Sequence, residues 1–232
     1  MSLNILYQDR HFVAINKPHG LLVHRSSIAK DADVFALQLL RDQLNAYIYP
    51  IHRLDRKTGG ALLFALNEEA LKITQGLFAT GKICKKYLAV VRGYTPDKDI
   101  IDYPLRKENG NLMEAITEFE TIARTELDIP FGKHKTSRYS LVSVYPKTGR
   151  MHQIRKHFSH IRHPIIADRP HGCNKQNRFF KERWQMDTML LHAQSLLFDH
   201  PFQENIKVSI EAPIQTEFQR MVQLMRWETI LR

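Results

Sequence analysis

Cysteine is scarce in this chain of 232 residues, whose two cysteines are Cys84 and Cys173. They lie far apart and form no Cys-x-x-Cys spacing, so neither a disulfide framework nor a cysteine-based zinc site is supported. No apolar run reaches membrane-spanning length, and nothing near the N-terminus resembles a charged leader followed by an apolar stretch. These absences lead us to expect a cytoplasmic protein that does not associate with membranes.

Acidic side chains are also in deficit. The sequence has 24 Asp and Glu against 34 Lys and Arg, a formal net charge of +10, and 12 His in addition. Such an excess argues for an acidic partner, of which nucleic acid is the commonest. The alternative is a basic surface with no particular partner. The hydrophobic share of 43% and the charged share of 25% are those of a soluble globular protein.

Several motifs of cofactor and metal enzymes are missing. Residues 76–82 superficially match a phosphate-binding loop, but Ile83 stands where a Ser or Thr should bind magnesium, and a helical pattern precedes it. The histidines of residues 157–163 have no Glu or Cys to complete a metal site, and no His-Glu-x-x-His pattern is present. A Gly-x-Ser-x-Gly elbow and a second acidic residue beside Asp55 are also lacking. Metal and serine-hydrolase chemistry are therefore disfavoured.

Apolar spacing gives a coarse map of secondary structure. It predicts strands over residues 5–7, 12–15, 87–91, 115–122, 139–145, 190–198 and 206–210. It predicts helices over 31–48, from Asn67 to a stop at Gly81, over 151–161 and from Pro213 onward. Residues 106–114 and 168–186 are expected to be long loops. We expect one domain of mixed α and β structure.

A single carboxylate, Asp55, lies inside the basic cluster of residues 52–57, ahead of a Gly-Gly turn and a short apolar run that reads as a buried strand. The flanking Arg53 and Arg56 should keep Asp55 ionised, because nearby positive charge lowers a carboxyl pKa. Such an aspartate can bind a cation, form a structural salt bridge or attack a carbon. Spacing alone favours the salt bridge and leaves the other two open.

The densest basic stretch covers residues 147–163. Helical spacing gives it a buried stripe of Met151, Ile154, Phe158 and Ile161. Arg155 falls at the edge of this stripe, where a guanidinium needs an anion, and Asp55 is the obvious candidate. Several cations also stand at the helix start, where the macrodipole disfavours them. Local stability does not explain that choice, whereas a phosphate or carboxylate partner does.

Four blocks of sequence follow one another in a recognisable order: Asn16–His24, His52–Gly60, Lys85–Gly93 and Thr148–His157, with His163–Asp168 after the last. Together they resemble the motifs of the large pseudouridine synthase family that modifies ribosomal and transfer RNA. They span most of residues 3–213. The resemblance implies an α+β fold of the pseudouridine-synthase type, with a mixed, mostly antiparallel bisected sheet flanked by helices and loops. It also implies a single catalytic domain over residues 1–232 without a separate N-terminal RNA-binding module.

Further stretches resemble the subgroup of this family that acts on uridine 65 of certain tRNAs. They are Leu22–Ser26, Asp102–Leu105, Arg162–Pro164, His171–Gly172, Gln176–Arg178, Leu191–Ala193 and His200–Phe202. Two departures stand out: Gly59 replaces the Ser that relatives commonly carry, and residues 106–114 form a shorter segment. The shorter segment bears on RNA specificity.

The reaction implied by the resemblance is an isomerisation that needs no cofactor and no metal. The uracil N-glycosidic bond breaks, the base turns, and its C5 joins the ribose. By resemblance Asp55 is the essential carboxylate, as nucleophile or as base at the ribose. Arg155 pairs with it and keeps it charged, and Tyr87 stacks against the target base.

The same resemblance implies contacts with RNA. A uridine inside a helix must first leave the stack, and Arg53 would fill the vacated space; its alternative role is a phosphate contact or a pair with Asp55. The other residues expected to bind RNA are Arg56, Lys147, Arg150, Lys156, Arg162 and Arg178. The expected partner is tRNA, with rRNA as the alternative and no obligate protein partner evident. A non-catalytic RNA-binding or chaperone protein of the same fold is the competing interpretation.

Overall fold

Two compact units make up the chain in this computed structural model, which describes residues 2–25, 33–107, 109–186 and 188–227. The first unit comprises Met1–Lys85 and His192–Ile214, and the second comprises Lys86–Leu191 and Gln215–Arg232. The prediction of a single catalytic domain stays a prediction.

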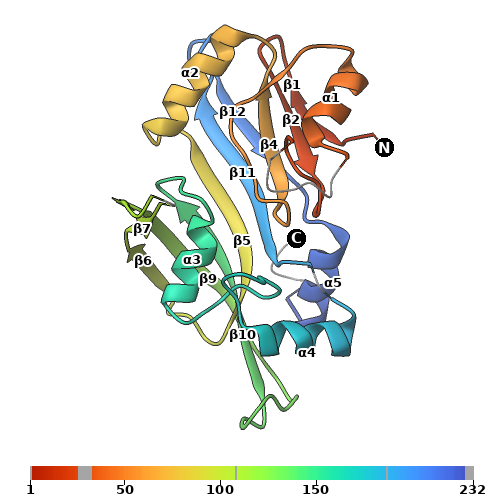
Figure 1. Ribbon diagram of the computed structural model, residues 1–232, viewed down its shortest axis with the longest axis vertical. Coiled ribbons are helices and arrows are strands. Elements are labelled where there is room, and N and C mark those ends of the chain that lie inside the picture. The colour runs from red at the N-terminus through yellow and green to blue at the C-terminus, as the bar shows by residue number, and fades with distance from the viewer. Residues whose placement is uncertain (1, 26–32, 108, 187, 228–232) are drawn as a thin grey trace. The chain divides into compact units, whose positions relative to one another are not determined.

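The first unit is built on a mixed sheet (Figure 1). Its elements are β1 (Ile5–Gln8), β2 (Phe12–Lys17), α1 (Ala36–Leu44), β3 (Tyr49–Pro50), β4 (Gly59–Ala65), α2 (Glu68–Ala79), β11 (Leu191–Asp199) and β12 (Lys207–Glu211). β2 and β3 pair antiparallel with β4, while β11 runs parallel to β4. All seven residues of β4 are buried, as its unbroken apolar run predicts for a strand covered on both faces.

The helices of the first unit match the predicted pattern in part. The side chain of Asn67 accepts a hydrogen bond from the Ala70 amide, and two glutamates follow in the first turn, so the predicted start of α2 is confirmed. α1 is shorter than the predicted 31–48, because it begins at Ala36 and ends at Leu44. Residues 31 and 32 of that prediction lie outside the described part of the chain.

The second unit has an antiparallel sheet with strand order β5-β10-β9-β6. Its elements are β5 (Cys84–Arg92), β6 (Lys98–Asp102), β7 (Leu105–Arg106), β8 (Leu112–Met113), β9 (Ile116–Leu127), β10 (Ser137–Pro146), α3 (Gln153–His160), α4 (Asn174–Trp184) and α5 (Thr216–Leu224). α3 packs over β9 and β10 (Figure 1), with Phe158 against Phe119 in the core. The predicted α+β class with mostly antiparallel sheets is confirmed.

Both segments predicted to be long loops contain regular structure. The first of them contains Arg106 of β7 and the whole of β8, which pair as a hairpin, and residues 168–186 contain α4. The prediction was wrong for α4 because its sequence is polar and lacks a continuous apolar stripe. The helix is instead held by aromatic packing of Phe180 on Tyr139 and Trp184, and tertiary packing supplies most helical stability in proteins. Met151 is another error: it is 53% exposed, because α3 begins after it.

In the part of the chain that the structure describes, no helix combines the length and apolar character needed to cross a membrane.

Candidate active site

Asp55 lies half-buried on the loop that joins β3 to β4 in the first unit. A turn closed by a hydrogen bond from the Thr58 amide to the Asp55 carbonyl (3.0 Å) shapes this loop. The two residues that follow, Gly59 and Gly60, enter β4 and pair with β11. Gly60 has a φ of +113°, and a Cβ atom there would lie 2.1 Å from the Ala193 carbonyl oxygen. Only glycine fits at this position, which explains the Gly-Gly sequence directly after Asp55 and fixes where the loop ends.

Lys17, at the end of β2, ties the block of residues 16–24 to the Asp55 loop. It is fully buried, and its Nζ donates to the carbonyl oxygens of Pro18 (2.9 Å), Leu21 (2.8 Å) and Arg56 (3.2 Å). Burial lowers the pKa of Lys17 to about 7, and the charge of Asp55 opposes that lowering. Three carbonyls matched to three ammonium donors make Lys17 the residue that holds these two segments together.

His52 begins the same loop as a neutral ring. Its Nε2 accepts a hydrogen bond from the Leu63 amide (3.1 Å), and the ring stacks on Phe78. Burial lowers the pKa of His52 to about 3, with the charge of Lys85 acting in the same direction. Because an uncharged nitrogen is needed to accept from an amide, this histidine supports the loop and does not add to its positive charge.

The second unit carries Tyr87 on β5 and Arg155 on α3. Arg155 is 7% exposed, so its guanidinium needs an anion, as predicted from its place beside the apolar stripe. Its Nε and Nη2 donate to the two carboxylate oxygens of Asp168, at 2.8 and 2.7 Å. This two-pronged geometry is the strongest form of a guanidinium–carboxylate pair. The predicted pairing of Arg155 with Asp55 joins residues of different units and stays a prediction.

Asp168, which carries the bond to Arg155, is held from several sides. Asn177 of α4 donates to the Asp168 carbonyl (2.7 Å) and accepts from the Ala167 amide (2.9 Å). A Cβ atom on Gly172 would lie 2.0 Å from the Asp168 carbonyl oxygen, so a larger residue there would displace this turn. Sequence reasoning included Asp168 and Asn177 in motif stretches but assigned them no role. The signal was an acid in an apolar run, and a buried acid needs a cation.

A buried amide fixes the turn that leads into α3. The side chain of Gln153 accepts from the Thr148 hydroxyl (2.7 Å) and the Arg150 amide (3.0 Å). It donates to the Ile116 carbonyl (2.9 Å) and the Thr117 hydroxyl (3.0 Å). All of its hydrogen-bonding capacity is thereby used, and such fully satisfied networks hold one arrangement. The basic residues beside this turn are therefore presented on a rigid support.

The structure brings together two of the residues predicted to bind RNA. A pocket of about 360 Å³ is lined by Arg150 and Lys156. The other residues of its lining are Leu105, Arg106, Lys107, Asn109, Met113 and Met151. Arg106 and Lys107 were missed, because the β7–β8 hairpin that carries them was predicted to be a loop. The lining of the pocket therefore combines apolar and cationic side chains.

The remaining predicted RNA contacts are spread over both units and outside this pocket. Lys147 is paired with Glu118 at 2.6 Å, so a phosphate would have to compete with this carboxylate for the ammonium group. Arg56 donates through Nε to the Gly20 carbonyl. Arg53, Arg162 and Arg178 are exposed.

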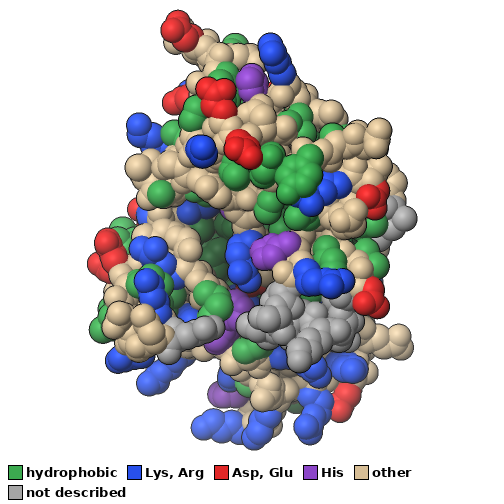
Figure 2. Space-filling model, turned by 45° about the horizontal axis from the view of Figure 1, so that its top comes forward, with side chains coloured by type: hydrophobic (Ala, Val, Ile, Leu, Met, Phe, Trp, Pro, Cys, Tyr) green, Lys and Arg blue, Asp and Glu red, His purple; other side chains and the backbone are tan. Residues whose placement is uncertain are grey.

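Positive charge is concentrated in the second unit. It has 22 Lys and Arg against 14 Asp and Glu, a net +8, whereas the first unit has 12 against 10, a net +2. Figure 2 shows Lys and Arg side chains outnumbering Asp and Glu on the face it draws. A basic surplus of this kind favours an acidic partner such as nucleic acid. Among the described residues, no three His, Cys, Asp or Glu side chains gather as ligands of a metal ion would.

Comparison with known proteins agrees with the motif order. The family model described as RNA pseudouridylate synthase matches residues 11–160. A tRNA pseudouridine synthase C of Haemophilus ducreyi is 43% identical over 98% of this chain and 97% of its own length. One from Vibrio parahaemolyticus is 40% identical over the same shares.

Two solved human structures share the fold. RNA Pseudouridylate Synthase Domain Containing 4 superposes with a TM-score of 0.75 at 21% identity, covering 96% of this chain and 93% of that one. Domain Containing 1 gives a TM-score of 0.73 at 23% identity, covering 97% and 95%. These matches confirm the predicted pseudouridine-synthase fold. Together with the family model and the bacterial relatives, they show that this chain belongs to the RNA pseudouridylate synthase family.

Proposed function

We propose that this protein is a tRNA pseudouridine synthase that isomerises uridine 65 of its substrate tRNAs, acting in the cytoplasm. The observation that carries the proposal is the identity of 43% and 40% to bacterial proteins named tRNA pseudouridine synthase C, over nearly the full length of both chains. The two cysteines, Cys84 and Cys173, are free thiols, which suits a reducing compartment.

The proposed chemistry centres on Asp55. Its carboxylate either attacks the ribose or removes a proton from it while the glycosidic bond breaks; the base then turns and C5 bonds to the sugar. Both routes need a charged carboxylate on a loop that does not move. The bonds from Lys17 and the close approach of Gly60 to Ala193 supply that rigidity.

Tyr87 and Arg155 have supporting roles in this proposal. Tyr87 stacks on the target base and assists proton loss from C5. Arg155 keeps Asp55 charged and oriented. A guanidinium of fixed orientation suits this role, and the bonds from Nε and Nη2 of Arg155 to Asp168 fix the plane of the group.

Access to a paired uridine requires the base to leave its stack, at a cost of a few kcal/mol. We assign Arg53, which is exposed on the Asp55 loop, to the space that the base vacates. Arg56, Lys147, Arg150, Lys156, Arg162 and Arg178 are assigned to RNA contacts. The cationic pocket at Arg150 and Lys156 supports this assignment for those two residues.

The substrate is tested by offering the purified chain two RNAs labelled with tritium at C5 of uridine: a tRNA mixture and ribosomal RNA. Both RNAs should come from cells that lack the protein. We expect tritium release from tRNA alone, and sequencing should place the new pseudouridine at position 65. Release from ribosomal RNA with none from tRNA would contradict the proposal. Tight tRNA binding with no release from either RNA would instead indicate a non-catalytic RNA-binding protein.

Affinity for tRNA should fall steeply with salt, because phosphate contacts release counterions. If Arg150, Lys156, Arg162 and Arg178 each meet one phosphate, raising salt from 50 to 200 mM should weaken binding by roughly 10²-fold. Filter binding across this range measures the slope. An affinity that does not change with salt would exclude electrostatic docking.

A further inference from the structure

A second pocket lies beside the connection between β9 and β10, within the second unit. Its volume is about 270 Å³, below the roughly 300 Å³ at which pockets begin to take drug-sized ligands. The side chains that matter for its chemistry are Arg92, Phe131, His134, Lys135, Arg138 and Gln176. No carboxylate lines it. Burial raises the pKa of the Tyr139 hydroxyl in its lining to about 12, so this hydroxyl is uncharged and adds no negative charge. The pocket is therefore small and positively charged.

Arg92 is the informative residue in this pocket. Arg92 is half-buried, and its guanidinium lies over the Phe131 ring, 5.9 Å from the centroid. Its Nη1 is 3.9 Å from the Cys173 sulfur. Arg138 pairs with Glu126, but within the described part of the chain neither Arg92 nor Lys135 has a carboxylate at ion-pair distance. A partly desolvated guanidinium without an anion is costly, and its donor fork matches a phosphate.

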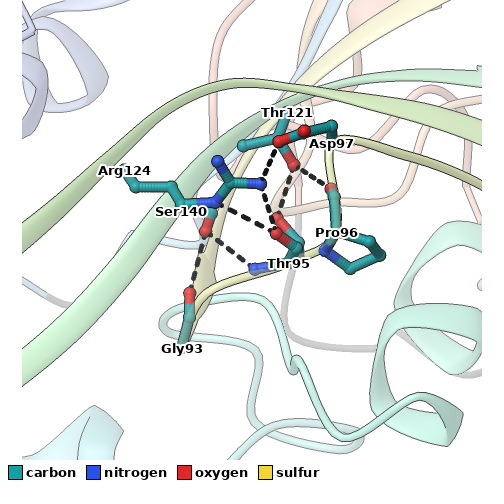
Figure 3. A network of polar contacts seen from close by, with 7 residues as sticks. All are labelled: Gly93, Thr95, Pro96, Asp97, Thr121, Arg124 and Ser140. Atoms are coloured by element: carbon teal, nitrogen blue, oxygen red, sulfur yellow. Dashed lines mark hydrogen bonds and ion pairs between the residues drawn. The ribbon is translucent and has the colours of Figure 1, made fainter.

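The turn that follows Arg92 is rigid. Figure 3 shows a network of polar contacts that fastens residues 93–97 to β9 and β10. The Ser140 hydroxyl donates to the Gly93 carbonyl and accepts from the Thr95 amide. Arg124 donates through Nε and Nη2 to the Thr95 carbonyl. The backbone that leads away from Arg92 is thereby fixed, which lowers the entropy cost of binding an anion at this position.

The opposite wall of the pocket is equally fixed. Gln176 of α4 donates to the Tyr139 hydroxyl at 2.6 Å, and Phe179 packs edge-on against Phe131 at 5.4 Å. The amides and carbonyls of Phe131 and His134 also bond to each other across the hairpin tip. α4 and the hairpin therefore form one preorganised frame around Arg92 and Lys135.

We propose that this pocket binds a backbone phosphate of the substrate tRNA, with Arg92 and Lys135 as the main ligands. The inference rests on the proposed function, which supplies the RNA. Tyr87 and Arg92 lie five residues apart on β5, about 16 Å at the usual strand rise. The phosphate bound here therefore belongs to a nucleotide other than the uridine that is isomerised. The pocket is an anchoring site for the RNA and takes no part in the chemistry.

The test compares the double variant Arg92→Gln/Lys135→Gln with Lys98→Gln. Lys98 is an exposed lysine of β6 that pairs with Glu120 and lies outside the pocket. For the double variant we expect the Kd of an unmodified tRNA transcript to rise about 5- to 10-fold at 150 mM salt. The slope of log Kd against log salt should fall by roughly 0.7–0.9, the value for one lost phosphate. KM for tRNA should rise in parallel, with kcat unchanged at saturating tRNA, and Lys98→Gln should resemble the wild type.

Two further single variants test the phosphate site in case the double variant does not fold. Arg92→Lys keeps the charge and should keep most of the salt slope. Lys135→Glu changes one exposed side chain and should weaken tRNA binding more than Lys135→Gln. Thermal unfolding identifies any variant that has lost its structure.

The outcomes separate this inference from the proposed function. Equal Kd and equal slope for the double variant and Lys98→Gln, with a wild type that releases tritium, would overturn the phosphate site alone. The phosphate site would also be overturned if Kd and slope were again equal and a mononucleotide bound at Arg92. The pocket would then bind a free anion and not the tRNA backbone. A wild type without activity, together with a weakened double variant, would overturn the proposed function and leave the anchoring site standing.

Discussion

Asp55→Asn should lower tritium release from C5-labelled tRNA by roughly 10⁴-fold or more, a loss typical of an essential catalytic carboxylate. The amide has the same shape, but it neither attacks the ribose nor accepts a proton from it. The loop should survive the change, because the bond that closes its turn uses the Asp55 carbonyl and not the side chain. Affinity for tRNA should therefore stay within about threefold of the wild type, since one neutral substitution leaves the phosphate contacts in place.

Asp42→Asn is the matched control for this experiment. Asp42 is an exposed aspartate of α1 in the same unit, where it accepts a hydrogen bond from Gln38. Its neutralisation changes the net charge by the same amount and should leave the rate unchanged. If Asp55→Asn kept more than a tenth of the wild-type rate, Asp55 would not be the essential carboxylate.

Asp168→Asn should destabilise the protein by about 3–5 kcal/mol, the usual result of leaving one member of a buried ion pair without its partner. Arg155 and Asp168 are 7% and 1% exposed, so little water reaches the guanidinium once the carboxylate charge is lost. Urea unfolding measures the loss. Activity should fall as well, because the orientation of Arg155 depends on the bonds from its Nε and Nη2.

Replacing both members of this pair distinguishes an effect on stability from an effect on function. Arg155→Met/Asp168→Leu exchanges both charges for apolar groups, and such replacements of a buried pair are often neutral or stabilising. We expect the double variant to recover most of the stability lost in Asp168→Asn and to remain inactive. Recovery of activity together with stability would show that Arg155 serves the fold and not the reaction.

Local sequence predicted the surroundings of Asp55 well. The buried strand after Gly59 and Gly60 and the capped helix that begins after Asn67 follow from short-range rules, and the structure has both. Gly60 must be glycine because a side chain there would collide with the carbonyl of Ala193, which is more than a hundred residues away in the sequence. The motif was visible in the sequence, but its cause was not.

Longer-range partners explain the other omissions. Lys17 reaches the Arg56 carbonyl across 39 positions, and Arg92 reaches the Phe131 ring across the same number. Arg155 and Asp168 are 13 positions apart and separated by the end of α3. Periodicity describes which face of an element is apolar; it does not report which polar groups meet across the fold. α4 was mistaken for a loop for the same reason.

The parallel pairing of Gly59 and Gly60 with His192 and Ala193 has a consequence for synthesis on the ribosome. β4 is made early, yet the strand that lies against its first residues is translated roughly 130 residues later. At the usual 5–20 residues per second, this delay is about 7–26 s. During that time Gly59 and Gly60 have no strand to pair with on the side that will face β11, and exposed edges invite aggregation. The loop that carries Asp55 is therefore among the last parts of the first unit to reach its final structure, and a ribosome that stops before residue 193 releases a chain in which Gly59 and Gly60 lack this partner strand.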